Sequence, residues 1–136
     1  MNTNVKEMIE KIEKQAETHS NEDRFVRTVQ MGQIIRQGDI YVERVKDNIS
    51  KGKETQELQL APGTSKGSRH ILVKDPGNLK VYENPTNDPL DGPIIQAKKR
   101  FALNHPEHPN FSIPSGTYKI TYQRDFAMEE RARVRD

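Results

Sequence analysis

The most constraining feature of the sequence is the alternation of apolar and polar side chains over residues 117–126. In an extended strand, one face carries a single arginine and four apolar side chains, which are Tyr118, Ile120, Tyr122 and Phe126. A slip of one residue would expose three aromatic rings, so the register of such a strand is strongly specified. The pattern predicts a long strand with one buried face.

The chain from residue 25 onward is typical of a β-rich fold. Short runs of β-branched and aromatic residues are separated by Gly, Pro, Asn and Asp, which is the pattern of strands and turns. We expect one hairpin between residues 32–36 and 39–46, and a second around the turn Asp75-Pro76-Gly77-Asn78. Residues 94–103 allow a helix or a strand, and the flanking turns favour the strand. The predicted fold class is mainly β, a small antiparallel barrel or sandwich with an added N-terminal α-helix.

That added helix is predicted from the spacing of apolar residues within residues 1–20. Val5, Met8, Ile9 and Ile12 recur at helical intervals, while Lys and Glu fill most of the remaining positions. The apolar stripe is narrow, and short isolated helices are marginal in water. We therefore expect the helix either to pack on its own sheet or to bind a protein partner or a second copy through these four residues.

The length and composition indicate one domain with a thin core. The chain has 136 residues, of which 32% are hydrophobic and 31% are charged. The predicted organisation is the N-terminal helix at 1–20, a linker and lead-in strand at 21–31, the β domain at 32–127 and a charged tail at 128–136.

Charge and cysteine content narrow the classes of partner and compartment. Lys and Arg number 22 against 20 Asp and Glu, so the net charge of +2 is not a basic field that gathers nucleic acid nonspecifically. There is no cysteine, which excludes disulfides and thiolate metal sites and fits a reducing cytoplasm. No apolar run approaches the roughly 18–20 residues that cross a bilayer. We expect a soluble, cytoplasmic protein.

The segment 104–109, Asn-His-Pro-Glu-His-Pro, is the strongest candidate for a chemical site. Each proline restricts the histidine before it to extended backbone, which pre-organises the rings of His105 and His108. With His70 as a third ligand and Glu107 as a carboxylate, these side chains would suit a divalent metal such as zinc. Two alternatives stay open. The rings either hydrogen-bond backbone groups to hold a long loop, or take part in acid–base chemistry without a metal.

A second candidate is the basic cluster Lys98, Lys99 and Arg100, which offers charge to a phosphate or to nucleic acid. No stacking aromatic motif accompanies it, so a solvated face is the alternative. The sequence shows no Ser-His-Asp order, nucleophile elbow or dinucleotide fingerprint.

Three segments together resemble a group of small, uncharacterised bacterial and phage proteins. They are RQGDIYV at 36–42, GSRHIL at 67–72 and HPEHPNFSIPSGTYKITYQRDF at 105–126. In that group the middle segment has a Gly-His-x-His element, whereas Ser68 stands at the first histidine here. The resemblance spans roughly residues 32–135 and implies a shared β domain, with no established activity.

The expected function is that of a noncatalytic binding or assembly module. A metal-binding protein or metal-dependent enzyme that uses the histidine cluster is one alternative. Weak phosphate or nucleic-acid binding is the other.

Overall fold

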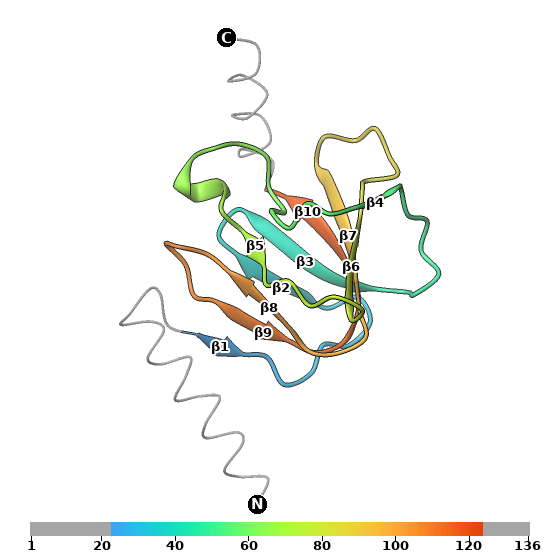
Figure 1. The fold of residues 1–136 in the computed structure, drawn as a ribbon, viewed down its shortest axis with the longest axis horizontal. Coiled ribbons are helices and arrows are strands. Elements are labelled where there is room, and N and C mark those ends of the chain that lie inside the picture. The colour runs from blue at the N-terminus through green and yellow to red at the C-terminus, as the bar shows by residue number, and fades with distance from the viewer. Residues whose placement is uncertain (1–22, 124–136) are drawn as a thin grey trace, which may run out of the picture.

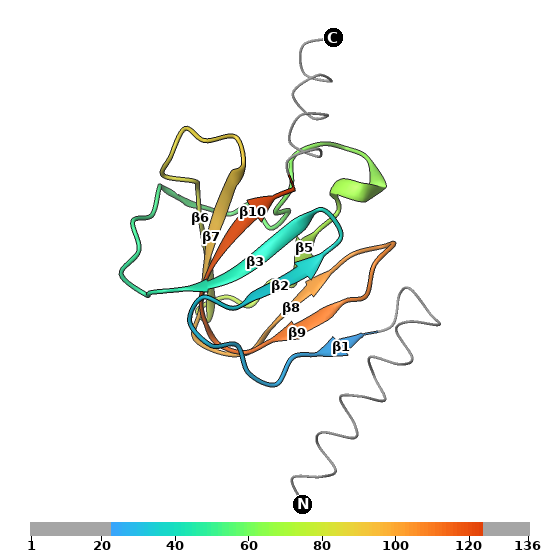
Figure 2. The same ribbon diagram turned by 180° about the vertical axis from the view of Figure 1, so that it is seen from behind.

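The computed structural model of the chain describes residues 23–123, which form ten strands in two sheets (Figure 1). Both views show β1, β8 and β9 grouped together, apart from β6, β7 and β10 (Figure 1, Figure 2). Side chains from both sheets meet in one hydrophobic core. Within residues 23–123, no helix has the length and apolar character needed to span a membrane.

The larger sheet has six strands in the order β2-β3-β10-β7-β6-β4. Their bounds are Ile34–Gln37 (β2), Ile40–Val45 (β3), Gly116–Tyr122 (β10), Asp91–Ala97 (β7), Leu79–Tyr82 (β6) and Glu54–Thr55 (β4). All pairs in this sheet are antiparallel, and β10 lies between β3 and β7.

The smaller sheet has four strands in the order β1-β9-β8-β5. Their bounds are Arg24–Phe25 (β1), Phe111–Ile113 (β9), Phe101–Asn104 (β8) and Ile71–Leu72 (β5). The β1–β9 pair is parallel and the other two pairs are antiparallel. A short 3-10 helix, η1 (Lys66–Ser68), precedes β5.

The alternation near the C-terminus is confirmed in β10 (Gly116–Tyr122), whereas Phe126, the last residue of the predicted strand, lies outside the described residues. Tyr118 and Ile120 are fully buried, and Tyr122 is half-buried and packs against the core. Thr117, on the opposite face, is also buried, and its hydroxyl donates a hydrogen bond of 2.8 Å to the carboxylate of Asp47. The other two residues of this face, Lys119 and Thr121, are half-buried, so the polar face is only partly exposed to water.

The predicted β2–β3 hairpin is confirmed, whereas the hairpin at residues 75–78 is wrong. The turn itself forms, with Gly77 at a φ of 84° and the amide of Leu79 bonded to the carbonyl of Asp75 at 3.0 Å. However, β5 and β6 on its two sides belong to different sheets, and β6 pairs with β7 instead. The connections β7–β8 and β9–β10 also cross between the sheets.

The division into two sheets bears on the predicted choice between a barrel and a sandwich. A mainly β fold is confirmed, but the strands of residues 23–123 divide into two sheets and do not close into a barrel. Within residues 94–103, a turn at residues 98–100 separates the end of β7 from β8, so the favoured strand is present as parts of two strands rather than one.

The added N-terminal α-helix is the second correction to the fold class. Residues 23–123 contain no α-helix, and residues 1–20 lie outside the described residues. Self-association or partner binding through that helix is therefore withdrawn, together with its four contact residues, Val5, Met8, Ile9 and Ile12.

Candidate functional site

The structure brings the three predicted histidine rings into one row. The ring centroids of His70 and His105 are 4.3 Å apart, and those of His105 and His108 are 4.6 Å apart. His70 lies just before β5, while His105 and His108 lie in the loop between β8 and β9. The side chain of Glu107, in the same loop, is exposed. The row runs from the buried His70 to the half-buried His108.

One buried amide fixes the inner end of this row. Gln37 is 1% exposed, and its Nε2 donates to the carbonyls of Leu103 at 3.1 Å and Pro109 at 2.9 Å. Its Oε1 must therefore be the acceptor in the 2.8 Å bond to Nδ1 of His70. This assigns the proton of neutral His70 to Nδ1 and leaves a lone pair on Nε2. That buried atom has no hydrogen-bond partner of good geometry within residues 23–123.

His70 is neutral near physiological pH. Burial, with the nearby rings of His105 and His108 as lesser causes, lowers the pKa of His70 from 6.5 to about 3. The backbone of Gly67 partly opposes this lowering of the His70 pKa, although Nε2 of His70 makes no well-formed hydrogen bond.

The middle ring, His105, holds the loop. Its Nε2 donates to the carbonyl of Gly67 at 3.1 Å, while its Nδ1 accepts from the amides of Glu107 at 3.0 Å and His108 at 3.2 Å. Burial lowers the pKa of His105 as well. Both ring nitrogens are engaged with backbone groups, which is the structural role that the sequence left open.

The ligand set predicted for a metal is therefore close together but not arranged around a common point. Across residues 23–123, no group of three or more His, Asp or Glu side chains has the geometry to hold an ion. Coordination through Nε2 of His105 would require that atom to leave Gly67 and lose its proton. The zinc site of His70, His105, His108 and Glu107 stays a prediction.

Beside the outer end of the row is a cavity of about 480 Å³, which we call the histidine–arginine pocket. Its lining residues are Arg24, Arg36, Gln37, Gly38, Asp39, His108, Pro109 and Phe111. Gly38 has a φ of 54°, and a Cβ there would lie 2.6 Å from Nε2 and Cδ2 of His108. Glycine is thus required at this position both for the backbone conformation and for the close approach of the ring.

Two guanidinium groups line this pocket. The Arg24 group lies 6.0 Å from the ring centroid of Phe111, and its Nε is buried without a hydrogen-bond partner among residues 23–123. The Nε of Arg36 donates to the carbonyl of Gly38 at 2.9 Å. Asp39 supplies the carboxylate of the lining. Neither arginine was predicted as a site residue, since nothing in the local sequence separates them from other surface arginines.

Residues 36–123 match a family described as a domain of unknown function, DUF8820. The chain belongs to this family. The DUF8820 match confirms the resemblance to an uncharacterised domain family, and it includes every lining residue of the pocket except Arg24. The comparisons with curated proteins and with solved structures found no match.

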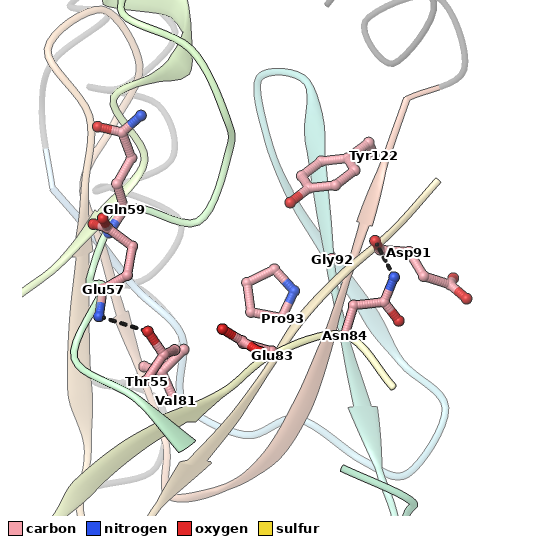
Figure 3. A pocket seen from close by; sticks show the side chains of 10 residues that line it. All are labelled: Thr55, Glu57, Gln59, Val81, Glu83, Asn84, Asp91, Gly92, Pro93 and Tyr122. Carbon is pink, nitrogen blue, oxygen red and sulfur yellow. Dashed lines mark hydrogen bonds between the residues drawn. The ribbon is translucent and has the colours of Figure 1, made fainter. Parts of the chain in front are cut away.

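A second cavity of the DUF8820 domain, of about 270 Å³, shares no residue with the histidine row (Figure 3). Its lining residues are Thr55, Glu57, Gln59, Val81, Glu83, Asn84, Asp91, Gly92, Pro93 and Tyr122. Many of its polar groups serve the fold. The hydroxyl of Tyr122 donates to the Leu60 carbonyl at 2.7 Å, Asp91 pairs with Lys119 at 3.2 Å, and Asn84 donates to the Asp91 carbonyl. Burial raises the pKa of Tyr122 to about 12. We therefore place the candidate site at the histidine–arginine pocket.

The basic cluster predicted for anions lies in the turn between β7 and β8. Lys98 and Lys99 are exposed, while Arg100 is half-buried and covers the ring of Phe25 at 4.0 Å. The Arg100 guanidinium donates to three carbonyls, those of Val26 at 2.7 Å, Ser112 at 3.0 Å and Arg27 at 3.2 Å. It fastens the β1 segment to the smaller sheet. Anion or nucleic-acid binding by the three residues stays a prediction.

Proposed function

We propose that the chain is a noncatalytic binding module whose ligand enters the histidine–arginine pocket. The observation that carries this proposal is the buried amide of Gln37, which joins the carbonyls of Leu103 and Pro109 to the ring of His70. These bonds fix the walls of the cavity before a ligand arrives. Pre-organisation of this kind lowers the ordering cost of binding.

The chemistry of the two inner histidines supports binding over proton transfer. An efficient acid or base has a pKa near the working pH, whereas that of His70 is about 3. His105 uses both ring nitrogens to hold the loop that ends at the pocket. These two rings lie behind the cavity and support the loop that carries two of its lining residues, His108 and Pro109. The cavity of about 480 Å³ falls in the range of small-molecule sites.

A screen of small fluorinated fragments by 19F NMR tests the proposal, with neutral, cationic and anionic members in the library. Gly38→Ala places a Cβ against the His108 ring, so we expect it to weaken pocket binders at least about ten-fold. Gly77→Ala is the matched control, because Gly77 also has a positive φ but a Cβ there meets nothing within 4 Å.

Circular dichroism establishes that both variants fold. If one variant fails to fold, amide shifts of residues 37–39 and 107–109 in the wild-type chain locate the binders instead. The proposal is overturned if no fragment binds the wild-type chain, or if Gly38→Ala and Gly77→Ala affect binding equally.

Metal binding is the second candidate function, and the lone pair on Nε2 of His70 favours it. Histidines that bind metals usually donate their other ring N–H to a second group, as Nδ1 of His70 does to Gln37. Calorimetric titration of the untagged chain with zinc tests it: stoichiometric binding that His70→Leu abolishes would support a metal centre. The bacterial or phage origin and the cytoplasmic location stay predictions from the sequence.

A further inference from the structure

We infer that the ligand of the histidine–arginine pocket carries an anionic oxygen group, a phosphate or a carboxylate, which Arg24 and Arg36 bind. This inference rests on the proposed function and names the chemical class of its ligand.

The first argument is the unsatisfied donor of Arg24. Its Nε is buried against the protein, yet no acceptor among residues 23–123 bonds to it, and the guanidinium carbon lies 6.0 Å from the ring centroid of Phe111. A guanidinium has five N–H donors and no acceptor, and leaving a buried donor unpaired costs free energy. Because Arg24 lines the pocket, a phosphate or carboxylate oxygen there would accept charge-assisted hydrogen bonds from the other N–H donors of the same guanidinium.

Arg36 supplies the second argument, because it is already oriented. Its Nε donates to the Gly38 carbonyl at 2.9 Å, and the guanidinium carbon lies 5.7 Å from the ring centroid of Tyr41. Another of its nitrogens reaches Gln123 at 3.5 Å, a long hydrogen bond that an oxyanion readily replaces. The planar group is held at the cavity with N–H donors to spare.

The charges of the lining give the third argument. Two guanidinium groups face a single carboxylate, that of Asp39, so the pocket has an excess of positive charge before His108 is counted. The Asp39 carboxylate also opposes the lowering of the pKa of the buried His105. One of its oxygens lies 4.0 Å from a Cβ built at Gly67. It therefore stands toward the η1 turn, and an anion is the ligand that balances the remaining charge.

The test uses the full chain labelled with 15N, titrated separately with inorganic phosphate and with acetate. Total ionic strength is held constant with sodium chloride, because salt screens exposed charges. We expect saturable shifts in the amides of residues 36–39 and in the Nε–H signals of Arg24 and Arg36. Arg24→Gln and Arg36→Gln should each weaken binding at least about ten-fold.

Arg69→Gln is the matched control, since it removes the same charge from an exposed arginine outside the pocket. We expect it to change the affinity less than about two-fold, which is the range of a remote, screened charge. Saturation by phosphate alone, or by acetate alone, supports the inference and identifies which oxygen group the site prefers.

Three outcomes count against it. Equal binding by the wild-type chain and Arg24→Gln overturns it. Neutral fragments that bind the pocket while both anions fail also overturn it, but they leave the proposed function standing. A pocket that takes neither fragments nor anions removes the proposed function as well.

Discussion

Replacement of Gln37 by leucine is the sharpest test of how the pocket is held. The change keeps the side-chain volume similar but removes three hydrogen bonds, of 2.8, 2.9 and 3.1 Å, at a position that is 1% exposed. It strands the Nδ1–H of His70 and deprives two carbonyls, those of Leu103 and Pro109, of a donor. At about 1–3 kcal/mol for each buried group left unsatisfied, the cost is roughly 3–9 kcal/mol.

Two effects bring this cost toward the lower end. Leucine gains about 1–2 kcal/mol from burial of its own apolar surface, and a carbonyl that keeps another donor loses less than one left bare. We therefore expect the free energy of unfolding to fall by about 3–5 kcal/mol, a large share of the roughly 5–15 kcal/mol that stabilises an ordinary domain.

Urea denaturation followed by circular dichroism measures this difference. Gln59→Leu is the matched control, because Gln59 also donates to two carbonyls, those of Ala61 and Gly63, but is half-buried. Water replaces such bonds, so we expect a loss below about 1 kcal/mol. Equal losses of unfolding free energy in the two variants would refute the conclusion that the buried hydrogen bonds of Gln37 hold the pocket together. The double variant Gln37→Leu, His70→Leu should lose less than the sum of the single changes, since one stranded donor is removed.

Two further predictions concern the histidine row and the β1 segment. The unfolded chain protonates His70 near pH 6.5 and the folded chain only near 3, so its contribution to stability is complete above pH 6.5 and is lost as the pH falls toward 3. Urea unfolding should show that the free energy of unfolding is about 2–3 kcal/mol lower at about pH 4.5 than at neutral pH, and that this difference disappears in His70→Leu. If the difference is unchanged in that variant, groups other than His70 cause it. Arg100→Gln should speed amide hydrogen exchange over residues 24–27 at least about ten-fold and cost about 2–3 kcal/mol, because it removes bonds to three carbonyls. Lys98→Gln, in the same turn but exposed, should change neither quantity.

Local sequence patterns predicted the longer strands better than they predicted the partners of those strands. The alternation that places Tyr118 and Ile120 in the core is a property of consecutive residues, so it can be recognised without knowing the neighbouring strands. The turn at 75–78 was also recognised, because proline and glycine set its backbone angles. Turn chemistry reverses the chain locally but does not determine which sheet the next strand enters. The hairpin prediction failed for that reason.

Some residues of the candidate site could likewise be recognised from the sequence, and others could not. The prolines after His105 and His108 drew attention to the loop. His70 was grouped with them from its place at a predicted strand just after Gly67-Ser68-Arg69, and its ring does lie beside that of His105. Gln37 gave no signal, since a glutamine before a glycine looks like an ordinary turn residue. Its importance comes from burial against β8 and the 105–110 loop, segments more than sixty residues away in the chain.

The place of β10 has a consequence for synthesis. It is the last described strand in the chain, yet it lies in the interior of the larger sheet, bonded along its length to β3 and β7. While the chain emerges from the ribosome, the edges of β3 and β7 that later pair with β10 therefore remain unpaired. Unpaired strand edges are prone to pairing with other chains. β10 can pair with these edges only after residue 122 has left the exit tunnel. A nascent chain stalled before that point exposes both edges, and we expect a chaperone to bind it.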